Sequence, residues 1–185
     1  MNSFLLSTGI VALAEIGDKT QLLSFVLAAR LRKPWAIIAG ILVATLANHA
    51  LASALGNLIA DRLPTGALRW LLGLSFLAMA AWMLIPDKLG NELHKPVRWG
   101  AFVTTVIAFF LAEMGDKTQI ATVALAARFD TFVPVVAGTT LGMMIANVPA
   151  VIIGERLADR LPVKAVHTIA AIIFALLGAV ALLYG

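Results

Sequence analysis

Two short stretches of this sequence carry the ionisable residues whose types and spacing could do chemistry. Residues 15–21 read Glu-Ile-Gly-Asp-Lys-Thr-Gln, and residues 113–119 read Glu-Met-Gly-Asp-Lys-Thr-Gln. Each stretch offers two carboxylates, one ammonium group and one glycine. With every group ionised, the four acids and two lysines leave a formal charge of −2. That charge matches one divalent cation.

Both stretches lie inside long apolar segments. The chain of 185 residues is 61% hydrophobic and 13% charged, against roughly 25% charged residues in a soluble domain. The apolar residues form long runs, which excludes a soluble globular protein and indicates an integral membrane protein. An ionisable side chain near the centre of a membrane helix costs roughly 2.5 to 3.5 kcal/mol. The motif side chains must therefore face each other, a cavity or an ion.

Other chemistry is excluded by composition. The chain has no cysteine, so disulfides, thiolate metal sites and cysteine nucleophiles are absent. His49, His94 and His167 have no metal-ligand spacing, and a zinc site is not predicted. We expect His94 in a central loop and His167 near a membrane interface. Oxygen ligands alone suit Mg²⁺, Ca²⁺ or Mn²⁺ better than zinc or copper.

The apolar runs predict the elements that must position these side chains. A hydrocarbon core of about 30 Å takes roughly 20 helical residues to cross. We predict six spans, over residues 3–29, 35–60, 66–85 (or from Trp70), 99–127, 131–154 and 165–184. The fold class is therefore an all-α integral membrane protein. Residues 1–10 lack a basic region and cleavage site, so we expect them to begin the first span.

The two halves of the chain are related by a shift of 98 residues. This shift superposes the two motifs, residues 28–30 on 126–128, and residues 61–64 on 159–162. Three spans per half is an odd number, so the second half must enter the membrane from the opposite side, as in secondary transporters. We predict a three-helix repeat over residues 1–86, a cytoplasmic linker over 87–98, and an inverted second repeat over 99–185. The repeats would pack as one transport domain; the alternative is a duplication kept only for packing.

The spacing inside each motif predicts a shared direction. In a helix, Glu15, Asp18 and Lys19 are three and four residues apart and project from one face. The second motif repeats this spacing. Gly17 and Gly115 could let the helix unwind and free carbonyl ligands, or could serve close helix packing.

Further polar residues lie at matching depth. Four amides are candidates for extra ligands or for supporting contacts: Gln21, Gln119, Asn48 and Asn147. For the two asparagines, interhelical hydrogen bonding is an equal alternative. Thr20 and Thr118 are expected to bond their own helix backbone. Pro149 predicts a local helix break, and residues 138–142 form a small-residue packing pattern. Lys19 and Lys117 are expected to pair with the acids or to gate access.

The doubled E-x-G-D-K-T element resembles the signature of the cation/proton antiporter family that includes Golgi manganese/calcium transporters and bacterial manganese exporters. The resemblance covers nearly the whole chain. It implies a transporter, not an enzyme, that moves Mn²⁺ or Ca²⁺ in exchange for protons and needs no cofactor. It also implies four acids as cation ligands: Glu15, Asp18, Glu113 and Asp116. The short central loop resembles the compact bacterial form, which favours manganese.

Three other readings have weaker support. An intramembrane aspartyl protease would need G-x-G-D, and here Glu15 and Glu113 replace the first glycine. A passive structural subunit of a membrane complex has no use for two acid clusters. An exporter of an organic cation such as lysine is a substrate-level alternative. The expected partners are thus a divalent cation, protons and the lipid bilayer, with no nucleic acid and no sequence signal of oligomeric state.

Basic residues predict the orientation. Between the predicted spans, nine lysines and arginines lie on one side: Arg30, Arg32, Lys33, Lys88, Lys95, Arg98, Arg156, Arg160 and Lys164. Three lie on the other side: Arg62, Arg69 and Arg128. By the positive-inside rule, the linker is cytoplasmic and both termini face the periplasm of a bacterial inner membrane.

Overall fold

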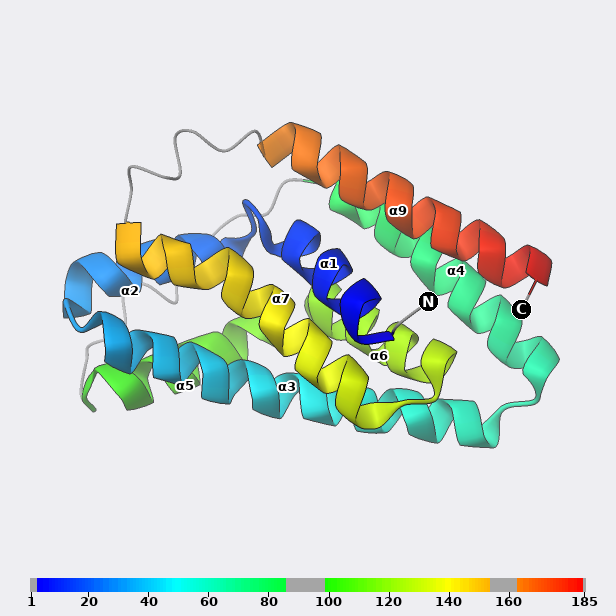
Figure 1. Ribbon diagram of the computed structural model, residues 1–185, viewed down its shortest axis with the longest axis horizontal. Helices are drawn as coiled ribbons and strands as arrows, with labels where there is room; N and C mark the ends of the chain where they lie inside the picture. The colour runs from blue at the N-terminus through cyan, green and yellow to red at the C-terminus, as the bar shows by residue number, and fades with distance from the viewer. Residues whose placement is uncertain (1–2, 86–98, 154–162, 185) are drawn as a thin grey trace.

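The computed structural model describes residues 3–85, 99–153 and 163–184 (Figure 1). All regular structure in these ranges is helical. The helices of the first half are α1 (Ser3–Glu15), α2 (Lys19–Leu31), α3 (Pro34–Arg62) and α4 (Thr65–Met83). Those of the second half are α5 (Ala101–Glu113), α6 (Lys117–Phe129), α7 (Phe132–Ile153) and α9 (Val163–Tyr184). The predicted linker over 87–98 and His94 lie outside the described residues.

The first and fourth predicted spans are each two helices, broken inside the motif. Gly17 has φ +82° and Gly115 has φ +76°, a region that glycine adopts without steric penalty. Asp18 and Asp116 follow in extended conformation and precede the first residues of α2 and α6. The expectation that Glu15, Asp18 and Lys19 share one face of a continuous helix is therefore wrong. The possibility that glycine unwinds the helix is confirmed at both positions.

The other helices lie close to the predicted spans. A residue in the left-handed conformation ends both α2 and α6, with φ 50° at Arg32 and 48° at Asp130.

The predicted break at Pro149 is wrong, because α7 continues through it to Ile153. Pro149 removes only one backbone donor, and helices tolerate this where neighbouring helices hold both sides in place.

Each broken span packs on the long helix of the other half. Helices α1 and α2 pack on α7, whereas α5 and α6 pack on α3, and α3 also contacts α7. Small residues allow the close approach: a Cβ atom at Gly138 would lie 2.5 Å from the Phe4 carbonyl oxygen. A Cβ atom at Gly40 would lie 2.9 Å from the Phe102 carbonyl oxygen. The 98-residue shift relates both pairs, and the packing role predicted for residues 138–142 is confirmed.

Helices α4 and α9 form a separate pair at one side of the bundle (Figure 1). The rings of Phe76 and Phe174 stack between them with centroids 6.2 Å apart. The pair packs on α1 and α6, and its contacts with α2 and α5 are minor or absent among the described residues. The pair therefore contacts the first helix of one broken span, α1, and the second helix of the other, α6.

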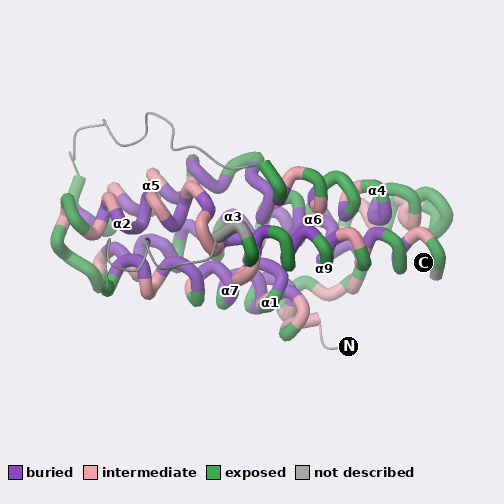
Figure 2. The backbone as a smooth tube through the Cα atoms, turned by 90° about the horizontal axis from the view of Figure 1, so that it is seen from above, coloured by how far each residue is buried: buried purple, intermediate pink, exposed green. Residues whose placement is uncertain are grey.

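The outward surface is apolar, and the interior holds the polar side chains. Helices α3, α4 and α7 are long and apolar enough to cross a membrane; α1, α5 and residues 167–183 are shorter apolar helices. Exposed residues line the outward sides of the helices in Figure 2, and large apolar side chains such as Leu46, Leu74 and Ile145 are among them. So much exposed apolar surface fits a multi-pass membrane protein, in which lipid covers it.

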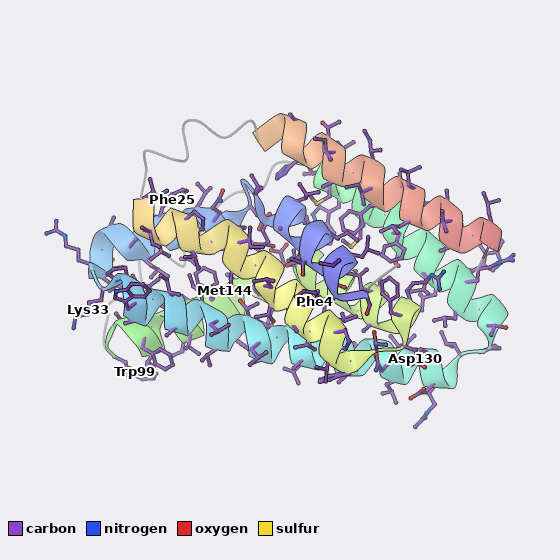
Figure 3. All side chains as sticks on the ribbon, in the orientation of Figure 1. Phe4, Phe25, Lys33, Trp99, Asp130 and Met144 are labelled. Atoms are coloured by element: carbon purple, nitrogen blue, oxygen red, sulfur yellow. The ribbon has the colours of Figure 1, made fainter. Side chains whose placement is uncertain are left out.

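The two ends of the molecule differ in which turns they present. Lys33 and Trp99 lie at one end in Figure 3, and Asp130, after α6, lies well away from them toward the other end. Arg30, Arg32 and Lys33 are all exposed at the α2–α3 turn. Of the other six basic residues expected on that side, five lie outside the described residues. The sixth, Lys164, is the second residue of α9.

Candidate functional site

The structure buries all four acids that the sequence analysis named. Glu15 and Glu113 are 0% exposed, Asp18 is 1% and Asp116 is 3% exposed. Each glutamate is the last residue of its helix, α1 or α5, where carbonyl groups give the helix end a partial negative charge. A glutamate carboxylate at such an end adds negative charge to negative charge. Both positions therefore attract a cation or a proton.

The aspartates and lysines of the two motifs form ion pairs across the halves. Lys117 Nζ lies 3.0 Å from Asp18 Oδ1. Lys19 Nζ lies 3.2 Å from Asp116 Oδ2. The lysine of each motif thus partners the aspartate of the other, which is the contact that the ion-pair alternative for the lysines requires. The pairs differ in environment, because the Lys19 side chain is 25% exposed and that of Lys117 is 2% exposed.

Each glutamate is held by a threonine that follows its break. Thr20 Oγ1 donates to Glu15 Oε2 at 2.6 Å, and Thr118 Oγ1 donates to Glu113 Oε2 at 2.9 Å. The expectation that these threonines bond their own helix backbone is wrong, since the breaks bring the carboxylates within reach. The second oxygen, Oε1, of each glutamate accepts no hydrogen bond from the described residues. A buried carboxylate oxygen without a donor is costly unless a proton or cation is supplied.

The acids interact as a group. Glu15 interacts electrostatically with Glu113 and Asp116, and Glu113 interacts with Asp116, Asp18 and Lys19. In this arrangement the described residues contain no set of three acidic or histidine side chains close enough to hold a metal ion together. Each aspartate has a carboxylate oxygen within 3.2 Å of a lysine Nζ. Cation binding by all four acids would require the lysine ammonium groups to withdraw.

The two glutamines brace the breaks. Gln21 Oε1 accepts from the Gly17 N–H at 2.8 Å, and Gln119 Oε1 accepts from the Gly115 N–H at 2.7 Å. Their Nε2 atoms donate to the Ala146 carbonyl oxygen at 3.0 Å and to Asn48 Oδ1 at 3.3 Å. The amide oxygens are thus occupied by backbone, which favours the supporting role over the ligand role.

The two asparagines join helices. Asn48 Nδ2 donates to the Phe110 carbonyl oxygen at 3.1 Å. Asn147 Oδ1 accepts from Ser24 Oγ at 2.7 Å, a partner that the sequence analysis missed. Ser24 recurs as Thr122 under the 98-residue shift, and that recurrence was the available signal. Interhelical hydrogen bonding is the role that this structure gives both asparagines.

The two described histidines are both buried. His49 is 0% exposed, and neither ring nitrogen has a hydrogen-bond partner among the described residues. His167 is 8% exposed, and its Nε2 lies 2.8 Å from the Ile16 carbonyl oxygen, inside the first break. The sequence analysis did not predict this contact, which the packing of α9 on α1 brings about.

Comparison with known sequences decides the family. The family described as divalent cation/proton antiporter GDT1 matches residues 3–91 and 101–185. The chain belongs to the GDT1 family. No solved structure matches at a significant level.

Three relatives illustrate how sequence identity to this chain varies. A Vibrio cholerae protein named "Putative manganese exporter" is 54% identical over 96% of this chain and 88% of its own length. The GDT1-like protein sll0615 of Synechocystis is 31% identical over 92% of each chain. GDT1-like protein 3 of Oryza sativa subsp. indica is 30% identical over 91% of this chain and 69% of its own length.

Membership of the GDT1 family makes this chain a transporter and not an enzyme. The chain is a multi-pass membrane protein whose cargo class is the divalent cation. The family resemblance drawn from the doubled motif is thereby confirmed.

Proposed function

We propose that this protein exports Mn²⁺ across a bacterial inner membrane in exchange for protons. The observation that carries the proposal is the two crossed Lys–Asp ion pairs, one buried and one partly exposed, together with two buried glutamates. Four acids from two broken helices supply hard oxygen ligands of the kind that Mn²⁺ accepts. We propose manganese as the cargo, and not calcium, because the relative with 54% identity is named for manganese export.

In the proposed binding step, a divalent cation replaces the ammonium groups of the two motif lysines. In the lysine-paired state, Lys19 and Lys117 neutralise the two aspartates. An entering divalent cation would displace both ammonium groups and bind Asp18 and Asp116. The free Oε1 atoms of Glu15 and Glu113 would then complete the carboxylate set. The formal charge of −2 on four acids and two lysines would be cancelled by one divalent ion.

Proton coupling follows from competition for the same oxygens. Carboxylates bind a metal ion only when deprotonated, so metal binding releases protons and acid weakens metal binding. In the empty site, a proton on either glutamate would satisfy the oxygen that lacks a donor. A proton-rich exterior would therefore displace the cation outward and leave a protonated site that returns inward.

The proposed architecture has six membrane crossings in two inverted repeats. Helices α1 with α2 and α5 with α6 would each be one broken crossing, the arrangement by which many transporters build ion sites near the midplane. Support comes from packing contacts that recur under the 98-residue shift, such as Gly40 on Phe102 and Gly138 on Phe4. Support also comes from the family match to two separate segments. The repeats would occupy residues 1–86 and 99–185, joined by the cytoplasmic linker 87–98, with both termini periplasmic.

Proteoliposomes test the proposal. Purified protein is reconstituted with a manganese-sensitive dye inside, and a pH gradient is imposed across the bilayer. We expect Mn²⁺ flux that follows the gradient and moves protons in the opposite direction. The matched control is Asp61→Asn, an exposed acid outside both motifs. Flux that ignores the gradient would indicate a uniporter, and gradient-driven lysine flux without Mn²⁺ flux would indicate an organic cation exporter.

A further inference from the structure

The peptide unit between Ile16 and Gly17 is held at both of its polar atoms. Its N–H group, on Gly17, donates to Gln21 Oε1 at 2.8 Å. Its carbonyl oxygen, on Ile16, lies 2.8 Å from His167 Nε2. A carbonyl oxygen can only accept, so His167 Nε2 carries the proton and donates. The planar peptide is thereby clamped between α2 and α9.

This peptide links the two acids of the first motif. Helix α1 ends at Glu15 and α2 follows Asp18, so carbonyl groups at this end of α1 lack helical partners. The orientation of the 16–17 peptide determines how the Glu15 carboxylate is placed relative to that of Asp18. A donor from α9 that holds this peptide therefore acts on both acids through the backbone between them.

Among the described residues, the second motif has the glutamine contact of this clamp but no donor equivalent to His167. The Gly115 N–H donates to Gln119 Oε1 at 2.7 Å, as in the first motif. No side chain among the described residues donates to the carbonyl oxygen of Met114, whose residue is 57% exposed. The 98-residue shift relates His167 to Arg69, and Arg69 instead lines a cavity with Ala127 and Arg128, at the far end of α6. Within the part of the chain that the structure describes, the clamp is therefore found in the first motif and not in the second.

We propose that His167 is a positioning residue for cation binding. It fixes the 16–17 peptide and couples the α4–α9 pair to the first half of the acid cluster. The proposal rests on the proposed function for its effect on cation affinity, and on the hydrogen bond alone for its effect on the break. The two effects are measured separately.

Two variants of similar length separate hydrogen bonding from packing. His167→Gln keeps an N–H donor, whereas His167→Met fills similar space without one. We expect His167→Met to raise the Kd for Mn²⁺ roughly three- to tenfold, the effect of one lost hydrogen bond. His167→Gln should stay within about twofold of the parent protein. Ile169→Ala, an exposed position on the same helix, is the control.

Hydrogen exchange without metal gives the second readout. In His167→Met, amide exchange over residues 16–19 should rise, while exchange over residues 114–117 in the same molecule stays constant. Equal Mn²⁺ affinity and equal exchange in the Gln and Met variants, both folded, would overturn the proposal. If the parent protein binds no Mn²⁺, the proposed function fails, but the exchange comparison still tests the clamp.

Discussion

The Nζ atom of Lys117 lies 3.0 Å from Oδ1 of Asp18, and both side chains are 2% exposed. A buried charge is tolerated when it is paired, and here the partner comes from the other half of the chain. The reciprocal pair, Lys19 with Asp116, is partly open. Two ion pairs between the motifs therefore join the two halves, and solvent reaches one of these pairs.

Neutralising an aspartate should abolish cation binding without loss of protein. Asp116→Asn preserves side-chain volume and removes one proposed ligand charge. We expect Mn²⁺ binding by titration calorimetry and Mn²⁺ resistance in cells to collapse while the membrane protein level holds. Asp130→Asn, at an exposed turn, is the matched control. Full resistance in cells with well-expressed Asp116→Asn would remove Asp116 from the site.

The two lysines should differ in their effect on stability. Lys117→Met removes the ammonium group that lies 3.0 Å from the buried Asp18 carboxylate. Breaking a buried ion pair costs roughly 3 to 5 kcal/mol. Lys19→Met should cost less, because solvent reaches the side chain of Lys19. Thermal unfolding in detergent, followed by tryptophan fluorescence, measures the order. Saturating Mn²⁺ should restore part of the loss in Lys117→Met, and equal destabilisation by both variants would contradict the predicted asymmetry.

Glycine at the break should be required for its backbone conformation. A Cβ atom at Gly115 meets nothing within 4 Å, so Gly115→Ala introduces only the strain of φ +76°. We expect a loss of roughly 1 to 2 kcal/mol in unfolding free energy and a clear fall in Mn²⁺ flux. Gly9→Ala also meets open space but lies within α1. It should be neutral or stabilising, and a similar loss in both variants would contradict this account.

Manganese affinity should rise with pH. Each carboxyl group that loses a proton on metal binding makes the affinity rise by about tenfold per pH unit while that group is protonated in the empty site. Titration calorimetry between pH 6 and 8 in buffers of different ionisation enthalpy measures the number of protons released. Glu113→Gln should lower that number if Glu113 carries one of them. A pH-independent Kd would rule out competition between metal and protons.

The orientation can be tested by reporter fusions after Gly185. The excess of basic residues on one side predicts a periplasmic C-terminus. A periplasmic phosphatase reporter should therefore be active there, and a cytoplasmic fluorescent reporter should be dark. A fusion within the linker, after Asn91, is the control and should give the opposite pattern. The same pattern at both positions would contradict the predicted topology.

The sequence was sufficient for the membrane class, the approximate bounds of the unbroken helices α3, α4, α7 and α9, the doubled motif and the family. These depend on local quantities: the length of apolar runs, the identity of residues 15–21 and 113–119, and a constant shift of 98. The identities of the buried acids also followed, because an ionisable group within an apolar segment must be sheltered from lipid.

Tertiary structure decided what those residues contact. Whether the helix continues through Gly17 or breaks there depends on the partners available to its freed backbone groups. Those partners, Gln21 and His167, lie on α2 and α9. The pairing of Lys117 with Asp18 joins residues 99 positions apart, and no local spacing specifies such a contact. Periodicity describes the direction of a side chain within one element, whereas the breaks and the crossed pairs arise only when helices from both halves pack together.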